Sequence, residues 1–249
     1  ADGSLWCWGD NRDGQAGDGT QGGDHEIKHT PVRVVSGGNG MAAVKTMDLG
    51  AHHSCAIDVN NKAWCWGKAE YGRLGNGNVN GHVLTPTRVT AVDSSAIVEL
   101  RAWAEGSCMR KIDGTIWCWG RNDVGQLGHD DPGGFSASAV RVHGIDDAIR
   151  LAPSGRWHNC VLRQNRTVWC WGWNDEGQLG NGNQIDQAAP VQVVGLANVR
   201  YLLQSTGHKS NMAITSDGTV YAWGKSYYGN LGIGQMSGTF LEIQQLDPW

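Results

Sequence analysis

Short apolar runs alternate with glycine-rich polar turns along the whole chain, and no stretch has the length and period of a convincing helix. Residues 63–112 illustrate the pattern, because four short segments rich in alternating or β-branched residues follow one another there. These segments are AWCWG from Ala63, TPTRVTAV from Thr85, IVELRAW from Ile97 and GSCMRKI from Gly106. Their order predicts four short β-strands joined by turns, and the same four parts recur elsewhere in the chain.

The AWCWG segment recurs at a nearly fixed interval. Its first aromatic residue is separated from the next by 58, 53, 52 and 52 residues, the positions being Trp6, Trp64, Trp117, Trp169 and Tyr221. A fixed period in this range indicates a repeat architecture. A catalytic motif normally occurs once, so we interpret the segment as structural.

Both faces of the recurring strand are apolar. Trp117 and Trp119 share one face, and Ile116 and Cys118 share the other. A four-stranded sheet stacked between two similar sheets buries both faces, as a β-propeller blade does. We therefore predict an all-β propeller, or a partial or open propeller, of about five four-stranded repeat units in a single array. The expected units are approximately 1–60, 61–112, 113–164, 165–216 and an incomplete 217–249.

The array is expected to start and stop within a unit. Asp2-Gly3 matches the turn before the recurring strand, but the two strands that should precede this turn are absent, and residues 239–243 fit a second strand. The expected total is therefore four full units and two further strands. Three hypotheses fit this count: a fragment of a longer protein, an open crescent, or strands supplied by another chain. An open sheet edge invites pairing, which favours the first and the third.

Six of the seven cysteines form pairs ten residues apart, each across a predicted hairpin. In CMRKIDGTIWC, a three-residue loop with Gly114 in the left-handed position sets Cys108 opposite Cys118. Directly opposed residues can lie close enough for a disulfide. The same register predicts two further bonds, Cys55–Cys65 with Asn61 in the left-handed position and Cys160–Cys170 with the less suitable Arg166 there. In the last unit Met212 and Ala222 replace both cysteines together, as a bonded pair predicts.

Metal binding is the alternative use of these thiols. Zinc sites usually bring two close ligand pairs together, and each hairpin here has no second pair nearby, which favours disulfides. The register partner of Cys7 would fall three positions before Ala1. We expect Cys7 to be free, bonded to residues outside this chain, or bonded to a second molecule. Disulfides imply an oxidising compartment, so the expected location is secreted, periplasmic or at the cell surface.

Composition and motifs exclude several functions. The chain has 20 Lys and Arg residues against 24 Asp and Glu residues, and this net charge of −4 does not indicate a nucleic-acid partner. No apolar run approaches the roughly 18 residues of a membrane span. No P-loop, HExxH motif or Ser-His-Asp order is present. We therefore expect a protein that is not an enzyme, with no catalytic residue, metal site or cofactor.

The repeats resemble a known family. The segments WGRNDVGQLG from Trp119, TPVRV from Thr30, LGAHHSCAI from Leu49 and SDGTVYAWG from Ser216 are similar to the Regulator of Chromosome Condensation repeat, over essentially the whole chain. The resemblance implies a β-propeller, commonly seven-bladed, that presents loops to a protein partner. The best-known member exchanges nucleotide on a small GTPase at chromatin, and a secreted bacterial relative binds and inhibits β-lactamase. Paired cysteines do not suit a nuclear protein, so a secreted, bacterial-type member is expected.

Two polar features receive a structural interpretation. His53 and His158 both precede a hairpin cysteine by two residues, and we expect buried histidines that hydrogen-bond to backbone. A metal site is not favoured, because Gly106 and Ser210 take this position in other units. Residues 10–14 resemble part of a calcium loop but lack its distal glutamate, so a polar turn is expected.

Positions at which the units disagree are the candidate binding residues. The residue after WG varies, and so does the residue three before the hairpin cysteine; Trp and Arg are typical interface anchors. The first unit is also the longest, and its extra residues, around GTQGGDHEIKH (19–29, with His25 and His29) or SGGNGM (36–41), predict one protruding loop. The two variable series are Asp10, Lys68, Arg121, Trp173, Lys225 and His52, Glu105, Trp157, Lys209. The candidate binding residues are Trp173, Trp157, Arg121, Trp103, Lys68 and Lys225.

These observations favour a non-enzymatic binding module that presents propeller loops to a protein partner outside the cytoplasm. Two alternatives remain open. One is a carbohydrate-binding adhesin that uses the extra tryptophans as sugar platforms. The other is a structural subunit of an extracellular assembly, joined by self-association through the open ends of the array.

Overall fold

The computed structural model describes residues 3–22, 26–35, 40–90, 96–153, 157–203, 209–225, 231 and 241–243. The chain forms strands β1 to β18 and divides into two compact units. The first unit comprises residues 1–112, 116–121 and 134–141, and the second comprises 113–115, 122–133 and 142–249. The fold is all-β, as predicted, while the extent of a single array remains a prediction. Within the described ranges no helix is long and apolar enough to cross a membrane.

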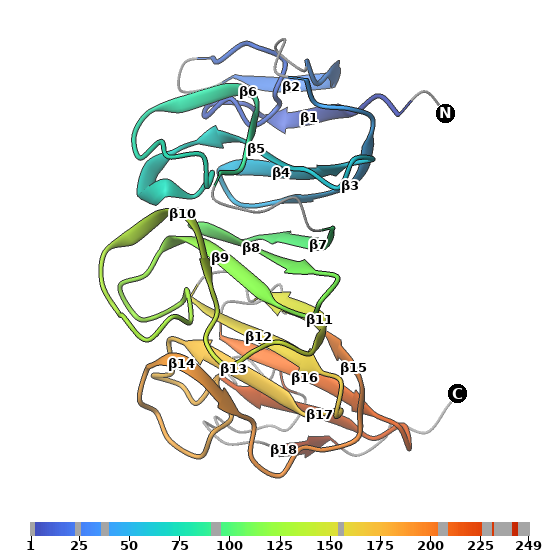
Figure 1. Ribbon diagram of the computed structural model, residues 1–249, viewed down its shortest axis with the longest axis vertical. Helices are drawn as coiled ribbons and strands as arrows, with labels where there is room; N and C mark the ends of the chain where they lie inside the picture. The colour runs from blue at the N-terminus through green and yellow to red at the C-terminus, as the bar shows by residue number, and fades with distance from the viewer. Residues whose placement is uncertain are drawn as a thin grey trace. The chain divides into compact units, whose positions relative to one another are not determined.

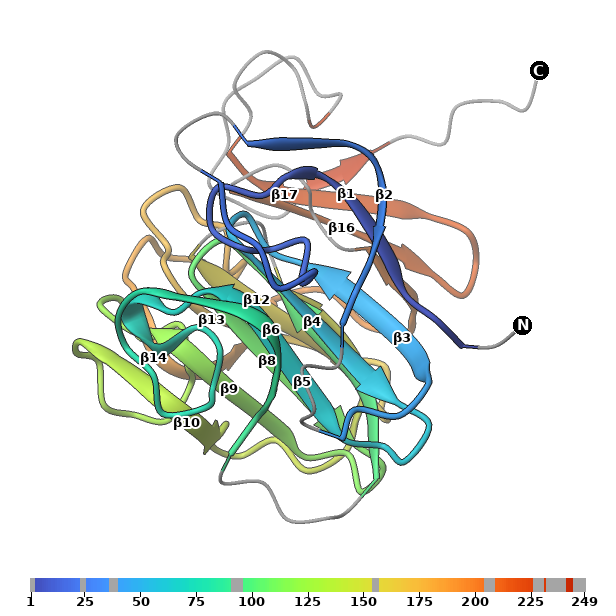
Figure 2. The same cartoon turned by 90° about the horizontal axis from the view of Figure 1, so that it is seen from above.

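The first unit holds three antiparallel sheets (Figure 1). A two-stranded sheet pairs β1 with β2, and two four-stranded sheets have the orders β3-β4-β5-β6 and β10-β9-β8-β7. Figure 2 shows β3 to β6. The bounds are β1 Trp6–Asp10, β2 Ile27–Arg33, β3 Val44–Leu49, β4 His53–Asp58, β5 Ala63–Lys68, β6 His82–Arg88, β7 Ile97–Ala102, β8 Gly106–Lys111, β9 Ile116–Arg121 and β10 Phe135–Arg141, with a 3₁₀ turn η1 at Glu70–Gly72.

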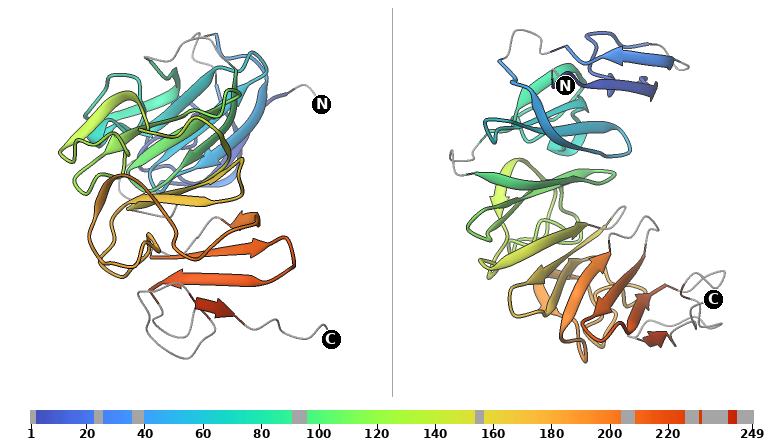
Figure 3. Two further views of the ribbon diagram at one scale, coloured as in Figure 1. Left: turned by 60° about the horizontal axis from the view of Figure 1, so that its bottom comes forward. Right: turned by 90° about the vertical axis from the view of Figure 1, so that its right-hand side faces the viewer.

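The second unit holds two four-stranded antiparallel sheets, ordered β11-β12-β13-β14 and β15-β16-β17-β18. Figure 3 shows them in yellow to red. Residues 241–243 form β18, which confirms the second strand expected near this point. The bounds are β11 Ala148–Pro153, β12 His158–Arg163, β13 Val168–Gly172, β14 Gln187–Gln192, β15 Val199–Leu203, β16 Ser210–Thr215, β17 Val220–Gly224 and β18 Leu241–Ile243.

Each four-stranded sheet combines halves of two sequence repeats. The first two strands of a sheet, such as β3 and β4, form a hairpin that we call the inner hairpin, and its second strand is the inner strand. The inner hairpin β3–β4 belongs to one repeat and β5–β6 to the next, yet all four strands form one sheet. The tight turn between β4 and β5 makes these strands neighbours, whereas the longer segment between β6 and β7 crosses to another sheet. Repeat boundaries drawn at the WCWG-type strands therefore divide each four-stranded sheet in the middle.

The three predicted disulfides are present: Cys55–Cys65, Cys108–Cys118 and Cys160–Cys170, each with 4.1 Å between the Cα atoms. The bonded residues are direct cross-strand partners in their hairpins, and Met212 faces Ala222 in the same register. Cys7 has no disulfide. The turn chemistry and the cysteine spacing thus specify one register.

Replacing Cys108 and Cys118 together by alanine is expected to lower the free energy of unfolding by about 2–3 kcal/mol. Each bond closes a short loop of the unfolded chain, so the stabilisation from lost chain entropy is modest. Urea denaturation of the double variant measures the loss, and non-reducing peptide mapping of the parent checks the pairing. A bond between cysteines of different hairpins would contradict the register.

Arg166 occupies the left-handed position of its hairpin, with φ 65°. A residue with a Cβ pays about 1–2 kcal/mol in this conformation, and glycine does not, although its freer unfolded chain offsets part of the gain. Arg166→Gly is therefore expected to raise the free energy of unfolding by about 0.5–1 kcal/mol in urea denaturation. Asn61, at φ 57°, provides the control, because asparagine tolerates this region and Asn61→Gly should change little. A destabilised Arg166→Gly protein would show that the arginine side chain has a packing role.

In four glycine-rich loops, one backbone carbonyl accepts a hydrogen bond from a tryptophan Nε1 of the next sheet. We call this recurring contact the interlock. The backbone carbonyl of Gln15 accepts hydrogen bonds from Trp66 Nε1 at 3.0 Å and from Ser54 Oγ at 2.8 Å. Three further loops repeat this geometry, and the indoles of all four sheets are buried. The other acceptors and donors are Arg73 with Trp119 and Ser107, Gln126 with Trp171 and Asn159, and Gln178 with Trp223 and Asn211.

Candidate functional site

The two series of variable positions are adjacent in each four-stranded sheet. The backbone N–H of the residue after WG donates to the carbonyl of the residue just before the inner strand, at 2.8–3.0 Å. The preceding glycine makes this approach possible: Gly120 has φ 112°, and a Cβ there would collide with the Glu105 carbonyl. We call these residues the variable pairs: His52/Lys68 and Glu105/Arg121 in the first unit, and Trp157/Trp173 and Lys209/Lys225 in the second.

In the second unit the variable pairs form an aromatic and charged patch. The rings of Trp157 and Trp173 lie 5.4 Å apart at 54°, and Lys209 Nζ lies 3.6 Å from the centre of the Trp173 ring. Asp175 accepts a hydrogen bond from Lys209 Nζ at 2.9 Å. We call Trp157, Trp173, Lys209 and Lys225 the tryptophan–lysine patch. Both tryptophans are half-buried, so each keeps surface available to a partner.

Acidic residues of the neighbouring loop hold the lysines of the patch. Glu176 lies 2.9 Å from Lys225 Nζ and 3.7 Å from Lys209 Nζ. Ion pairs of this kind contribute little stability at a surface, about 0–1 kcal/mol each. Their main effect is to fix the lysine side chains, and Lys209 covers part of the Trp173 ring. The sequence places Trp173 and Trp157 in separate series, and the structure brings them together.

In the first unit the equivalent residues form a different cluster. Arg121 is bonded to Glu105 at 2.9 Å, and its guanidinium lies 5.0 Å from the centre of the Tyr71 ring. Lys68 bonds to Glu70 at 2.8 Å, and this hydrogen bond is the main reason that the pKa of the Glu70 carboxyl is lowered. The candidates Arg121 and Lys68 therefore already have acidic partners within their own unit.

The loop that carries Tyr71 departs from three other described loops. In those three an asparagine side chain accepts the backbone N–H five residues on, as Asn122 does from Leu127 at 2.9 Å. Ala69 and Arg73 replace this asparagine and the following glutamine. Arg73 is buried and donates to the carbonyls of Glu70 and Ala104, and Tyr71 adopts φ 59°. Burial is the main cause of the lowered pKa of Arg73. The presence of Ala69 and Arg73 in place of the asparagine and the glutamine is the sequence signal for the Arg73–Tyr71 cluster.

Trp103 lies in the core rather than at the surface of the protein. Its exposed fraction is 3 %, and a Cβ on Gly106 would collide with its indole. In the preceding sheet the roles are exchanged, because Gly50 lies against the ring of His53. A large ring thus fills this space from either of two positions. Among the six candidate binding residues, Trp103 is the one whose side chain is buried in the core.

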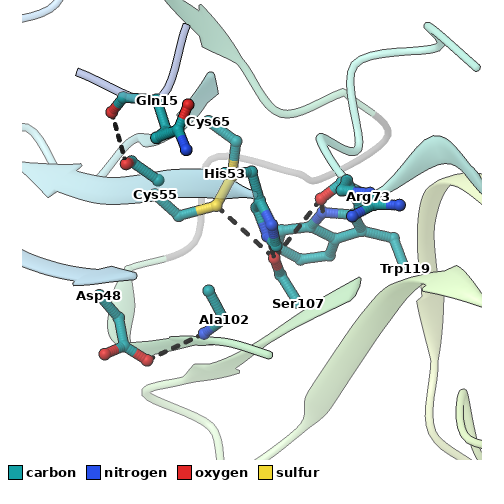
Figure 4. Close-up of a disulfide and its surroundings, with 10 residues drawn as sticks. Gln15, Asp48, His53, Cys55, Cys65, Arg73, Ala102, Ser107 and Trp119 are labelled. Atoms are coloured by element: carbon teal, nitrogen blue, oxygen red, sulfur yellow. Dashed lines mark hydrogen bonds between the residues drawn. A yellow bond between two sulfur atoms is a disulfide. The ribbon is translucent and has the colours of Figure 1, made fainter. Parts of the chain in front are cut away.

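His53 and His158 are buried, as expected, but their partners are side chains of the next sheet rather than backbone. His53 Nε2 lies 2.8 Å from Ser107 Oγ (Figure 4), and His158 Nε2 lies 3.1 Å from Asn211 Oδ1. Burial lowers the pKa of His53 to about 3, with a smaller contribution from the charge of Arg73. Burial also lowers the pKa of His158 to about 4.

Cys7 and His29 lie on the two strands of the first sheet. Burial raises the pKa of the Cys7 thiol above its ordinary value. His29 is exposed on β2, whereas His25 and residues 36–39 of the predicted protruding loop lie outside the described residues. No group of three or more His, Cys, Asp or Glu side chains in the described ranges is arranged to hold a metal ion.

Repeated four-stranded sheets that interlock through their tryptophans define a propeller-repeat protein. The chain matches the Regulator of chromosome condensation (RCC1) repeat over residues 2–57, 60–102, 113–162 and 167–214. It therefore belongs to the RCC1 repeat family, as the sequence motifs indicated.

Known relatives are larger than this chain. It is 30 % identical over 235 residues to the ultraviolet-B receptor UVR8 of Arabidopsis thaliana, covering 94 % of this chain and 52 % of the receptor. It is also 30 % identical over 244 residues to the E3 ubiquitin-protein ligase HERC2 of Homo sapiens, covering 94 % of this chain and 5 % of the ligase. The chain thus spans about half of the first relative and a small part of the second.

A solved structure supports the fold. Prp20p from Saccharomyces cerevisiae, described with its binding properties to Gsp1p and histones, superimposes with a TM-score of 0.80 at 22 % identity. The match covers 98 % of this chain and 60 % of that one. At this identity the likeness establishes the β-propeller fold class.

Proposed function

We propose that the chain is a non-enzymatic binding module that contacts a protein partner through its variable pairs. The tryptophan–lysine patch is the observation that carries this proposal. Repeat structure requires neither Trp157 nor Trp173, since other residues take these positions in sibling sheets. Both belong to the residue types that anchor protein interfaces, and both are partly accessible.

The geometry of the patch favours a protein partner over a carbohydrate. A sugar platform needs a free aromatic face, whereas Lys209 Nζ sits 3.6 Å from the centre of the Trp173 ring and the Trp157 ring is tilted by 54°. Mixed charges around two aromatic rings suit the polar and aromatic surface of a protein. A glycan array tests the adhesin alternative, and sizing over a range of concentrations tests self-association.

We also place this activity outside the cytoplasm. The support is chemical: three cross-strand disulfides are present, and such bonds persist in oxidising compartments. This location separates the proposed partner from those of a nuclear exchange factor. Recovery of the protein with all three bonds intact from the producing cell, under thiol-blocking conditions, tests the proposal.

Trp173→Ala and Trp157→Ala are expected to weaken partner binding by about 1–3 kcal/mol while leaving the melting temperature within a few degrees. A partner isolated by pull-down provides the affinity measurement, paired with a melting curve for each variant. Tyr201→Ala is the matched control, because Tyr201 is an exposed aromatic residue of the same unit outside the patch. A large drop in melting temperature would make the tryptophans core residues. Unchanged affinity in both variants would move the binding face elsewhere.

A further inference from the structure

Three arginines recur at one position of β2, β6 and β10, the strands that follow the WCWG strands of the first unit. Each arginine faces the first aromatic residue of its WCWG strand, whereas Gln192 and Glu242 take this position in the second unit. The repeat therefore does not require a cation there. The facing pairs are Arg33 with Trp6, Arg88 with Trp64 and Arg141 with Trp117. All three arginines are exposed, and no acidic side chain among the described residues lies within ion-pair distance of them.

The tight turns that precede the WCWG strands lie at the same strand ends and carry exposed aliphatic side chains. Val59 begins the turn between β4 and β5 and is 56 % exposed, and Ile112 begins the turn between β8 and β9 and is 69 % exposed. Gln164 and Ser216 take the same place in the second unit, as the matching backbone hydrogen bonds show. Aliphatic tips are therefore a property of the first unit and not of the repeat.

The two four-stranded sheets of the first unit present these turns at a common end. Toward the other end of the strands, Asp48 Oδ2 accepts the backbone N–H of Ala102 at 2.9 Å, and His53 Nε2 lies 2.8 Å from Ser107 Oγ. These contacts align β3 with β7 and β4 with β8. The interlock repeats between the two-stranded sheet and the next, so β2 follows the same alignment. We call Arg33, Arg88, Arg141, Val59 and Ile112 the turn face.

The acidic groups near the turn face are already engaged. Buried Asp58 accepts two backbone N–H groups of its own turn and the Trp64 indole N–H, each at 2.9 Å. Asp113 accepts the backbone N–H of Thr115 at 2.9 Å. Glu99 forms ion pairs with two neighbouring arginines at 3.1 Å. The exposed arginines thus leave an excess of positive charge at this end, in a chain whose net charge is −4.

A concavity of about 470 Å³ opens at this end of the first unit. Lys62 and Arg88 both line it, so two cations of different segments are available to one small anion. The other lining residues are Gly40, Asp58, Asn60, Trp64 and Thr87. Because Asp58 directs its carboxylate to the turn backbone and the indole, the two cations suit a compact group such as a phosphate.

We propose that the turn face docks on an anionic lipid surface. Val59 and Ile112 enter the boundary between headgroups and acyl chains, and the arginines bind lipid phosphates. The combination specifies this partner. Basic side chains alone suit any polyanion, but aliphatic tips gain by leaving water only where the partner offers an apolar interior. In the first unit the variable pairs lie at the opposite strand ends, so lipid docking does not depend on the proposed protein binding.

Flotation of the 249-residue chain with vesicles tests the proposal. We expect binding to vesicles of phosphatidylglycerol and phosphatidylcholine in equal parts, weakening as salt is added, and little binding to phosphatidylcholine alone. Replacing Arg88 and Arg141 together by glutamine should weaken binding about 25-fold, or about 5-fold for each arginine. The matched control is Arg12→Gln with Lys28→Gln, which makes the same change in net charge at the opposite ends of β1 and β2 and should bind nearly as the parent does. Equal losses in the two double variants would show that net charge alone acts, and would overturn the turn face as the site.

A second variant separates a lipid surface from a soluble polyanion. Val59→Gln with Ile112→Ser places the residues of the second unit at the two tips and leaves the net charge unchanged. We expect vesicle binding to weaken about 10-fold, because the aliphatic side chains no longer enter the bilayer. Melting curves check that each variant is folded. Unchanged vesicle binding would overturn the proposal, as would tighter binding of the parent to double-stranded DNA than to the vesicles. Either result leaves the partner-binding proposal for the tryptophan–lysine patch unaffected.

Discussion

Trp119→Ala is expected to lower the free energy of unfolding by about 3–5 kcal/mol, whereas Trp8→Ala should cost about 0.5 kcal/mol or less. The two tryptophans occupy the same position of the repeat and lie in the same compact unit. Trp119 is buried, and its Nε1 donates to the Arg73 carbonyl at 2.9 Å. Its removal creates a large cavity at the interlock between sheets. Trp8 is largely exposed, so little packing is lost there.

Urea denaturation of both variants and the parent protein measures this contrast. Because both positions belong to the first unit, the two changes report on the same part of the fold. Trp119→Phe adds a finer comparison, since it retains much of the packing but loses the indole donor to Arg73. A Trp8→Ala protein destabilised as strongly as Trp119→Ala would show that the outer face of β1 is covered in solution.

The strands and their register could be predicted from the sequence because local rules determine them. Gly114 and Asn61 favour the left-handed turn position, and the hairpin that follows sets cysteine opposite cysteine. Period, turn and cysteine spacing all indicate the same register, so each supports the others. A sequence predicts its strand register well when repeat period, turn residues and side-chain pairing all specify the same structure.

The proposed binding surface is harder to predict because it depends on contacts between residues of different strands. The sequence marks Trp157 and Trp173 as variable but does not show that their rings meet, or that Lys209 covers one of them. Trp103 illustrates the converse case, in which packing rather than exposure explains the tryptophan. It is a candidate binding residue, yet its side chain is buried, and with Gly106 it fills the space that His53 and Gly50 fill in the sibling sheet. Exchange of a large and a small residue between two positions is invisible when each position is compared alone.

Acidification below pH 6.5 is expected to destabilise both compact units through their buried histidines, by about 2 kcal/mol each between pH 6.5 and pH 4.5. Burial penalises the charged imidazolium, so the folded pKa falls to about 3 for His53 and about 4 for His158, below the ordinary value of 6.5. The unfolded chain then binds more protons than the folded one in this window. The stabilisation is complete above pH 6.5 and is lost as the pH falls toward the folded pKa.

Two carboxyls oppose this trend only at lower pH. Burial is the main cause of the raised pKa of Asp48 in the first unit and of Asp186 in the second, so each binds a proton more readily in the folded state. Their contribution is confined to the range in which carboxyls titrate, and the interval from pH 6.5 to pH 5 isolates the histidines. There each histidine should contribute a slope approaching 1.4 kcal/mol per pH unit.

The test compares the pH dependence of the unfolding free energy in the parent protein, His158→Gln and His53→Gln. Each substitution is expected to remove about one proton from the difference in proton uptake between folded and unfolded states, whatever its effect on stability at pH 7.5. The doubly substituted protein should lose about two protons from this difference between pH 6.5 and pH 5. An unchanged slope of unfolding free energy against pH in either single variant would mean that the substituted histidine accepts a proton in the folded state. The contact of His53 with Ser107, or of His158 with Asn211, would then have to rearrange around a buried charge.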